Sequence, residues 1–597
     1  VVDIKLIYHG AGRIYNFPSF FRTTQFFFSH LLYPSGLIEY VNAFISQMFY
    51  YSPLGSAAIT IVVWLNAIFI QYILKENNLT RFSFLRFLPA LIAVITFSQY
   101  TYRFPFFIIM TVVWAFTGFY ISLKIKNLFL DLTLLILLSV FLYAIVGAAF
   151  FIFVGLVLLY RLFNSYNLSA AIIFTVSSLL IPYLIGVLCY KDSLDNAYTR
   201  LMPFFWKITT IEPDQLTLVW MYILYFTLPM IMALCYIYSL IKSKAANSVT
   251  RKSRGLSKNT AVKFKFVLLF AGSPAKIALV LLVLVSVYFF IFDSSLKIIF
   301  QIDYYLTNRN WSKVIASVKR FPERNFYVVN ALNQALYHQG LLGEDMFDFP
   351  QHPYALFFTE KSHISVHWQK ISLLMDLGFV NYAEHETAES LEKFGPRPYL
   401  LKNIIISALA KRNYASAGVY LNNLSKTVFE HKWADDYIER MKSDPDLKND
   451  QTIQLIRKNM VSNNYGYSSL SITDVLISLL QKNPENKMAF EYLMTWYLLN
   501  GEIENVIKNF GIINSFGYKK LPKYYQQAYL FHTLALGHKA SLCGYKIDPS
   551  VLETSRQAIG YFNMLRAGDP KAINVLSEKY GDSYIYYFIS YLSMMQK

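Results

Sequence analysis

Four ionisable residues in one polar stretch between apolar segments are the strongest candidates for chemistry. Asp192 and Asp195 occur as Asp-Ser-Leu-Asp, and Arg200 and Lys207 follow in the same stretch. Two carboxylates three residues apart can share a helix face and hold a divalent cation. Arginine and lysine can bind the phosphates of a lipid pyrophosphate. The stretch 190–215 is therefore either such a site or a solvated, charged loop.

Other candidate constellations are less complete. His363 and His367 are four residues apart and could face one metal ion, but no third ligand is specified. Asp131 lies within an apolar stretch, where a carboxylate either relays protons or pairs with a nearby base such as Lys126. The sequence contains no Walker A loop, dinucleotide glycine fingerprint, Gly-x-Ser-x-Gly elbow or His-Glu-x-x-His site. Nucleotide hydrolysis and standard hydrolase chemistry therefore lack support.

The composition divides the chain into two different halves. Of 597 residues, 55% are hydrophobic and 15% charged, whereas globular chains carry about 25% charged residues. Residues 1–293 contain 22 basic and 9 acidic residues, and residues 294–597 contain 33 and 28. The first half is predicted to be a membrane domain and the second to be water-soluble. Three cysteines give no disulfide framework, and the net charge of +18 is explained by membrane topology rather than by nucleic acid.

The membrane domain is predicted from apolar stretches of roughly 20 residues, the length that crosses about 30 Å of hydrocarbon. The stretch 128–163 carries Gly147 between two apolar runs, which favours a tight helical hairpin over one long helix. Eight spans are predicted: 53–74, 84–100, 104–122, 128–146, 148–163, 168–189, 216–239 and 276–292.

Basic residues in short loops predict the orientation, because such loops are retained in the cytoplasm. The loop 240–275 holds eight basic residues and no acid, which predicts a cytoplasmic location. Alternation then places the segment 1–52 and the domain 294–597 outside. A chain that starts outside at Val1 without an initiating methionine leads us to expect a further span upstream, or a cleaved signal peptide.

The segment 1–52 is predicted to form amphipathic helices at the outer membrane interface. In 36–50 apolar residues recur at helical spacing, while Glu39, Asn42 and Ser46 share another face. The phenylalanines within 20–28 form an aromatic patch typical of the headgroup level. Such helices either pack on the bundle or form a mouth over a lipid-linked substrate.

A sequence pattern in this segment also resembles that of other proteins. Tyr33–Tyr40 reads Tyr-Pro-Ser-Gly-Leu-Ile-Glu-Tyr, and Phe44–Tyr50 and Pro53–Gly55 follow it. The pattern resembles an uncharacterised family of polytopic inner-membrane proteins from Bacteroidota with a tetratricopeptide-like C-terminal half. That family has Pro-Gly-Gly-Leu at this point, so Ser35 replaces an expected glycine. The resemblance implies a multi-pass protein of the bacterial inner membrane with a periplasmic C-terminal domain, and no established activity.

The second half is predicted to be helical throughout. Turn signals recur at Gly340, Gly378 and Asn413, in steps of 38 and 35 residues, close to the ~34-residue tetratricopeptide period. The expected fold is all-α: a polytopic transmembrane bundle followed by an external tetratricopeptide-like α-solenoid. The expected domains are interfacial helices at 1–52, about eight transmembrane helices at 53–293, and a periplasmic helical domain at 294–597.

Two functions from different classes fit this organisation. In the first, the solenoid binds or scaffolds envelope proteins and no cofactor is needed. In the second, the chain resembles GT-C-type glycosyltransferases in architecture, which implies a polyprenyl-phosphate-linked sugar donor and an external acidic residue as base or metal ligand. Glu39, Asp192 and Asp195 would then be catalytic, with a divalent cation possible. Arg200 and Lys207 would bind the lipid phosphate, and membrane lipids are partners under either function.

Overall fold

The computed structural model describes residues 2–15, 17–164, 168–204, 215–249, 274–321, 325–357, 367–461 and 471–592. Contacts divide the chain into two compact units. The N-terminal unit consists of Val1–Gly10, Ile14–Ser294 and Lys426–Val428, and the C-terminal unit of Ala11–Arg13, Ser295–Ser425 and Phe429–Lys597. The described part of both units is helical and contains no β-strand, which confirms the all-α prediction.

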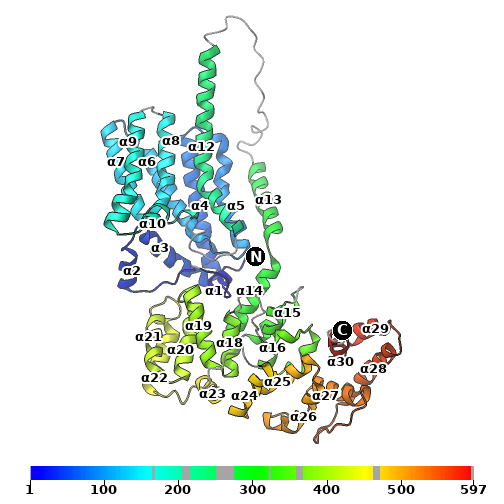
Figure 1. Ribbon diagram of the computed structural model, residues 1–597. Helices are drawn as coiled ribbons and strands as arrows, with labels where there is room; N and C mark the ends of the chain where they lie inside the picture. Colours follow the sequence, from blue (N-terminus) through cyan, green and yellow to red (C-terminus); the bar gives the residue numbers. More distant parts are fainter. Residues whose placement is uncertain are drawn as a thin grey trace. The chain divides into compact units, whose positions relative to one another are not determined.

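The N-terminal unit is a bundle of apolar helices preceded by short ones (Figure 1). Its α-helices are α1 (Ile4–His9), α2 (Thr24–His30), α3 (Gly36–Ser46), α4 (Ser52–Glu76), α5 (Leu88–Ser98), α6 (Phe104–Leu123), α7 (Leu128–Val146), α8 (Phe150–Asn164), α9 (Leu168–Ile181), α10 (Leu194–Thr199), α12 (Gln215–Val249) and α13 (Pro274–Ile291). Short 3₁₀ segments cover Gln47–Tyr50, Thr80–Phe87 and Gly147–Ala149, and a π-helix covers Pro182–Cys189.

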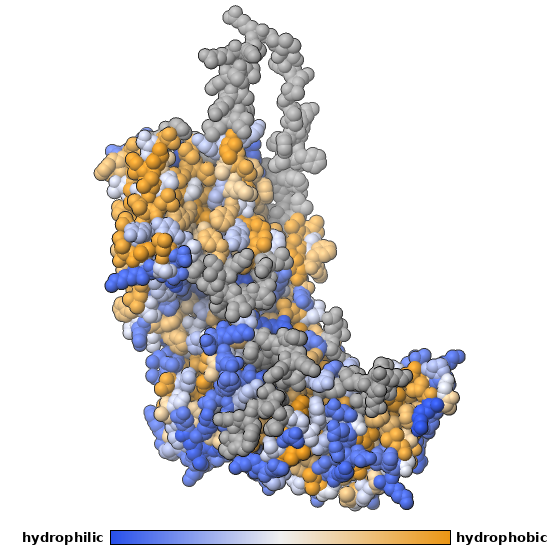
Figure 2. Space-filling model, in the orientation of Figure 1, coloured by the Kyte–Doolittle hydropathy of each residue, from blue (hydrophilic) through white to orange (hydrophobic). Residues whose placement is uncertain are grey.

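Six helical segments among the described residues are long and apolar enough to cross a membrane, so the chain is a multi-pass membrane protein. A bent pair, Val285–Ile291 with Ser294–Thr307, would make a seventh. Hydrophobic residues dominate the visible face of this bundle (Figure 2). Most of the predicted basic loop 240–275 lies outside the described residues.

One of the six segments, Leu128–Leu162, folds back on itself. Its two helices, α7 and α8, are separated at Gly147, and an ion pair of 2.8 Å joins Asp131 in α7 to Arg161 in α8. In one straight helix these two residues would be about 45 Å apart at 1.5 Å per residue. The segment is therefore an antiparallel hairpin, and Asp131 pairs with Arg161 and with the Tyr120 hydroxyl, at 2.9 Å, rather than with Lys126.

Helix α3 packs its polar face inward. Asn42 and Ser46 are buried and both bond to the Tyr102 hydroxyl, at 3.0 and 2.7 Å. Leu37, Val41 and Phe44 are exposed on the opposite side. A helix that hides its polar groups and exposes its apolar ones within a membrane protein is suited to contact with lipid.

The C-terminal unit is a series of shorter helices (Figure 1). They are α14 (Ser294–Thr307), α15 (Trp311–Lys319), α16 (Phe326–His338), α17 (Leu342–Asp345), α18 (His367–Leu377), α19 (Val380–Phe394), α20 (Pro398–Ala410), α21 (Tyr414–Leu424), α22 (His431–Ser443), α23 (Gln451–Asn459), α24 (Ile472–Lys482), α25 (Lys487–Asn500), α26 (Ile503–Lys508), α27 (Lys523–Leu530), α28 (Pro549–Arg566), α29 (Ala572–Tyr580) and α30 (Tyr584–Tyr587). Consecutive helices pack together, as in α18 with α19 and α20 with α21. The identity of these pairs as tetratricopeptide-like repeats stays a prediction.

Candidate functional site

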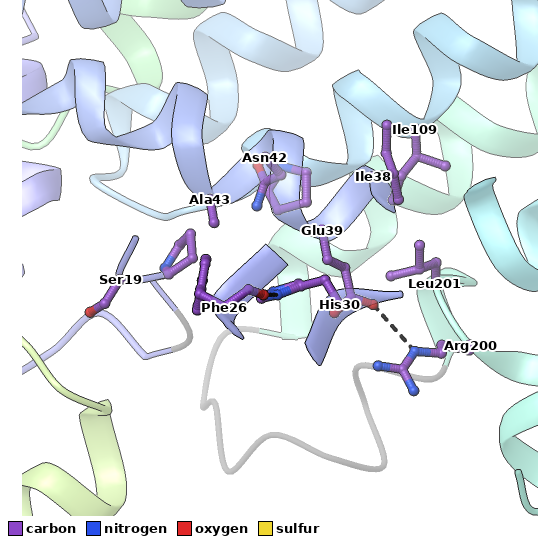
Figure 3. A pocket seen from close by; sticks show the side chains of 12 residues that line it. Ser19, Phe26, His30, Ile38, Glu39, Asn42, Ala43, Ile109, Arg200 and Leu201 are labelled. Atoms are coloured by element: carbon purple, nitrogen blue, oxygen red, sulfur yellow. Dashed lines mark hydrogen bonds and ion pairs between the residues drawn. The ribbon is translucent and has the colours of Figure 1, made fainter. Parts of the chain in front are cut away.

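A cavity of about 270 Å³ lies within the N-terminal unit, beside α2 and α3 (Figure 3). It brings together one carboxylate, one guanidinium and one imidazole, from Glu39, Arg200 and His30. The remaining lining residues are Pro18, Ser19, Phe26, Ile38, Asn42, Ala43, Pro105, Ile109 and Leu201. Two of the residues predicted from the sequence, 161 positions apart in the chain, thus share one cavity.

Glu39 is held in the first turn of α3 by three donors. Its Oε1 accepts hydrogen bonds from Ser35 Oγ at 2.9 Å and Arg200 Nε at 3.2 Å. Its Oε2 accepts one from the Tyr33 hydroxyl at 3.1 Å. Burial and the charge of Glu39 raise the pKa of Tyr33, so this phenol stays protonated and keeps donating. Both carboxylate oxygens are therefore engaged.

Arg200 follows α10 and lies between two acids. Its guanidinium is 4.1 Å from the centre of the Tyr33 ring, and its Nη1 is 3.9 Å from Asp192 Oδ2. Asp192 uses Oδ1 locally, accepting from the Ser193 amide at 2.8 Å and the Asn196 side chain at 2.9 Å. Its Oδ2 is buried and has no hydrogen-bond partner among the described residues. Two carboxylates therefore face a single guanidinium.

A π-helix at the end of a membrane span places Asp192. The π-helix Pro182–Cys189 continues α9, and the Asp192 amide donates to the Gly186 carbonyl at 3.0 Å. A β-carbon on Gly186 would lie 2.3 Å from the Tyr143 hydroxyl and 2.8 Å from Ala197 Cβ, so only glycine fits. Tyr143, in α7, also donates to the Ala197 carbonyl at 3.0 Å, which fixes α10 against α7.

The turn between α2 and α3 places the other side of the site. Ser35, where the resembling family has glycine, adopts the left-handed conformation with φ of 73°. At Gly36 a β-carbon would lie 1.5 Å from the His30 carbonyl oxygen. The Pro-Ser-Gly sequence is thus the local reason that the end of α2 touches the start of α3, and that His30 and Glu39 line one cavity.

The sequence analysis missed His30. Its Nδ1 lies 2.7 Å from the Phe26 carbonyl oxygen, and its ring packs edge-on against the Phe26 ring. The sequence did contain one indication of His30. It is a lone titratable residue that follows an aromatic run and is separated from the Tyr-Pro-Ser-Gly turn by two residues.

Asp195 does not line this cavity. Asp192 precedes α10, whereas Asp195 lies in its first turn with an exposed side chain, so the two do not share a helix face as expected. Lys207 and His363 lie outside the described residues. No group of three or more His, Cys, Asp or Glu side chains placed to hold a metal occurs in the part of the chain that the structure describes.

An exposed apolar surface covers the outer side of the same two helices. Phe28 near the end of α2 and Leu32 after it are 62% and 73% exposed. The surface continues over Leu31, Leu37, Val41 and Phe44. The two helices that line the cavity thus also expose apolar side chains suited to the lipid headgroup region.

The chain belongs to a family of unknown function, DUF6057, whose model matches residues 17–591. No curated protein and no solved structure matches the chain. The membership agrees with the resemblance to an uncharacterised family and brings no activity with it.

Proposed function

Within this family, we propose that the chain is a GT-C-type membrane glycosyltransferase that uses a polyprenyl-phosphate-linked sugar. One observation carries the proposal: Glu39, Asp192 and Arg200, which come from two distant parts of the sequence, meet beside a cavity lined by two helices that expose apolar side chains. A transfer from a lipid phosphate needs a cation for the phosphate and polar groups for the sugar, next to a path for the lipid. Arg200 supports the first requirement, Glu39 and His30 the second, and the exposed apolar side chains of α2 and α3 the third.

Arg200 supplies the phosphate-binding cation in this proposal. Its Nη2 makes no hydrogen bond with any described residue, so donors remain for a phosphate oxygen. Glu39 holds the guanidinium through Nε, and Tyr33 covers its face. When the bond between the anomeric carbon and the phosphate oxygen breaks, negative charge grows on that oxygen, and a fixed guanidinium stabilises it.

The proposal includes the bacterial inner membrane and an external site. With basic loops in the cytoplasm, α2, α3 and α10 lie on the periplasmic side, where lipid-linked sugars are consumed. Cys543, exposed in the C-terminal unit, is a native probe of this orientation. In a Cys189→Ser, Cys235→Ser background, an impermeant maleimide should label Cys543 in intact spheroplasts. A cysteine at position 255 should be labelled only after lysis, and the reverse pattern would contradict the orientation.

The activity is tested in two steps. Deletion of the chromosomal copy should change the envelope glycans detected by mass spectrometry, and the wild-type chain should restore them. Purified full-length protein in nanodiscs should bind undecaprenyl phosphate, and Arg200→Gln should weaken that binding about tenfold or more, the loss of one charge-assisted contact. Arg86→Gln, in the segment Thr80–Phe87, is the matched control. Unchanged glycans in the deletion strain would end the proposal.

A scaffold function is the second candidate, because consecutive helices of the C-terminal unit pack in pairs, as in solenoids that bind proteins. It predicts that envelope glycans are unaffected by Arg200→Gln, and that removing residues 296–597 releases a specific envelope protein from the purified complex.

A further inference from the structure

Three donors, from Ser35, Tyr33 and Arg200, bond to Glu39 and leave one of its roughly four lone-pair sites. A proton on this carboxylate would cancel the charge that holds Arg200. A general base needs an open lone pair within hydrogen-bond reach of the hydroxyl that it activates. Glu39 fits a different task, which is to hold Arg200 in position.

His30 has an open lone pair that can take a proton without disrupting the Glu39–Arg200 ion pair. A carbonyl oxygen can only accept, so the contact of 2.7 Å between Nδ1 and the Phe26 carbonyl requires the proton on Nδ1. The neutral ring then carries its lone pair on Nε2. Nε2 has no hydrogen-bond partner among the described residues, and His30 lines the same cavity as Glu39 and Arg200 (Figure 3).

The other polar side chain of α3 in the cavity is already engaged. Asn42 donates to the Tyr102 hydroxyl at 3.0 Å and accepts from it at 3.2 Å, in a buried network with Ser46. An amide has no basic lone pair in any case. His30 therefore has both the chemistry and the open position.

We infer that His30 is the proton acceptor of the transfer, and that Glu39 is a positioning residue for Arg200. The inference rests on the proposed function. The acceptor hydroxyl gives its proton to His30 Nε2 while its oxygen forms a bond to the anomeric carbon. The bond from that carbon to the lipid-phosphate oxygen breaks, and its electron pair leaves with the phosphate, beside Arg200. The imidazolium returns the proton to water.

The test uses three substitutions at one position, in the full-length chain. His30→Asn keeps a nitrogen donor near Nδ1 and removes Nε2, and His30→Gln puts an amide near the Nε2 position. Each should lower envelope glycosylation by about 10²-fold or more, because neither amide accepts a proton. His30→Gly in spheroplasts should regain activity when imidazole is added, whereas Glu39→Gln should not. His385→Asn, on the exposed face of α19, is the matched control.

The outcomes separate this inference from the proposed function. Undecaprenyl phosphate binding in nanodiscs should be unchanged in His30→Asn, which also shows that the chain is folded, and reduced in Arg200→Gln. Wild-type glycosylation with His30→Asn, while Arg200→Gln is inactive, would overturn the inference and leave the transferase intact. Loss of activity in His30→Gly that imidazole does not restore would also overturn it. Unchanged glycans in the deletion strain would overturn both.

Discussion

Two carboxylate–arginine clusters lie in the N-terminal unit, and they differ in exposure and in charge balance. Asp131 and Arg161 pair one to one between α7 and α8, with side chains only 10% and 9% exposed. Glu39 and Arg200 are 31% and 22% exposed, border a cavity, and have Asp192 as a second acid. The first cluster is closed and charge-balanced, and the second is open with one carboxylate in excess.

The contrast indicates which cluster stabilises the fold and which is available for chemistry. A charge buried with a single partner cannot exchange that partner without a large penalty, so the Asp131–Arg161 pair serves to close the hairpin. A partly exposed ion pair contributes little to stability, so the contacts of Arg200 can be rearranged at low cost. A charged residue within the membrane domain is thus a weak guide to function by itself. Whether its partners neutralise its charge is a better guide.

The largest effect is expected from breaking the closed pair. Arg161→Met leaves Asp131 as an unpaired charge within the bundle and should destabilise the fold by about 3–5 kcal/mol. Adding Asp131→Leu should recover most of the loss, since Arg161 Nη1 is itself buried without a partner among the described residues. Unfolding in mixed micelles, followed by circular dichroism, measures both. A double variant as unstable as the single one would show that the pair does more than balance charge.

An intermediate effect is expected at the turn that builds the open cluster. Gly36→Ala brings a methyl group against the His30 carbonyl and should cost about 1–3 kcal/mol, the range for overpacking. Because α2 must move away from α3, the same variant should also reduce glycosylation. Gly560→Ala, in α28 with open space at its β-carbon position, is the control and should be neutral or stabilising. Wild-type stability of Gly36→Ala would contradict the close approach of the two helices.

The smallest change in stability is expected in the open cluster itself. Glu39→Gln keeps an acceptor for Ser35 and removes a partly exposed ion pair, which should cost no more than about 1 kcal/mol. Glycosylation should nevertheless fall by about 10²-fold, because Arg200 loses the charge that positions it. Glu39→Gln should therefore lower glycosylation with little loss of stability, whereas Arg161→Met should lower both. A stability loss of the size seen for Arg161→Met would assign both clusters the same structural role.

Much of the fold follows from local patterns, and much of the site does not. Gly147 between two apolar runs predicted a break in the stretch 128–163, and the structure has separate helices there. The spacing in α3 predicted one apolar and one polar face. It could not tell which face packs inward, because in a membrane protein the usual rule that apolar residues lie inside does not hold.

The site depends on contacts that no local pattern encodes. Glu39 and Arg200 were each singled out by residue type, but their ion pair depends on how α10 folds back on the bundle. Asp195 was selected for its spacing from Asp192, a criterion that assumed one continuous helix over both. His30 was missed because its open nitrogen depends on a tautomer, which the Phe26 carbonyl four residues earlier in α2 sets.

The π-helix before Asp192 holds one residue more than the regular helix register of this span requires. A π-turn holds about one residue more than an α-turn, so Pro182–Cys189 behaves as an α-helix with an insertion. Deleting one residue would let the segment close as regular α-helix and keep its apolar character. The residues that follow would then stay near their present register, because the π-turn already absorbs the extra residue. A residue deleted from the regular helix α9 has no such outlet, so everything that follows would rotate by roughly 100° and retract by about 1.5 Å. Asp192 would turn away from Arg200 in the second case and stay beside it in the first.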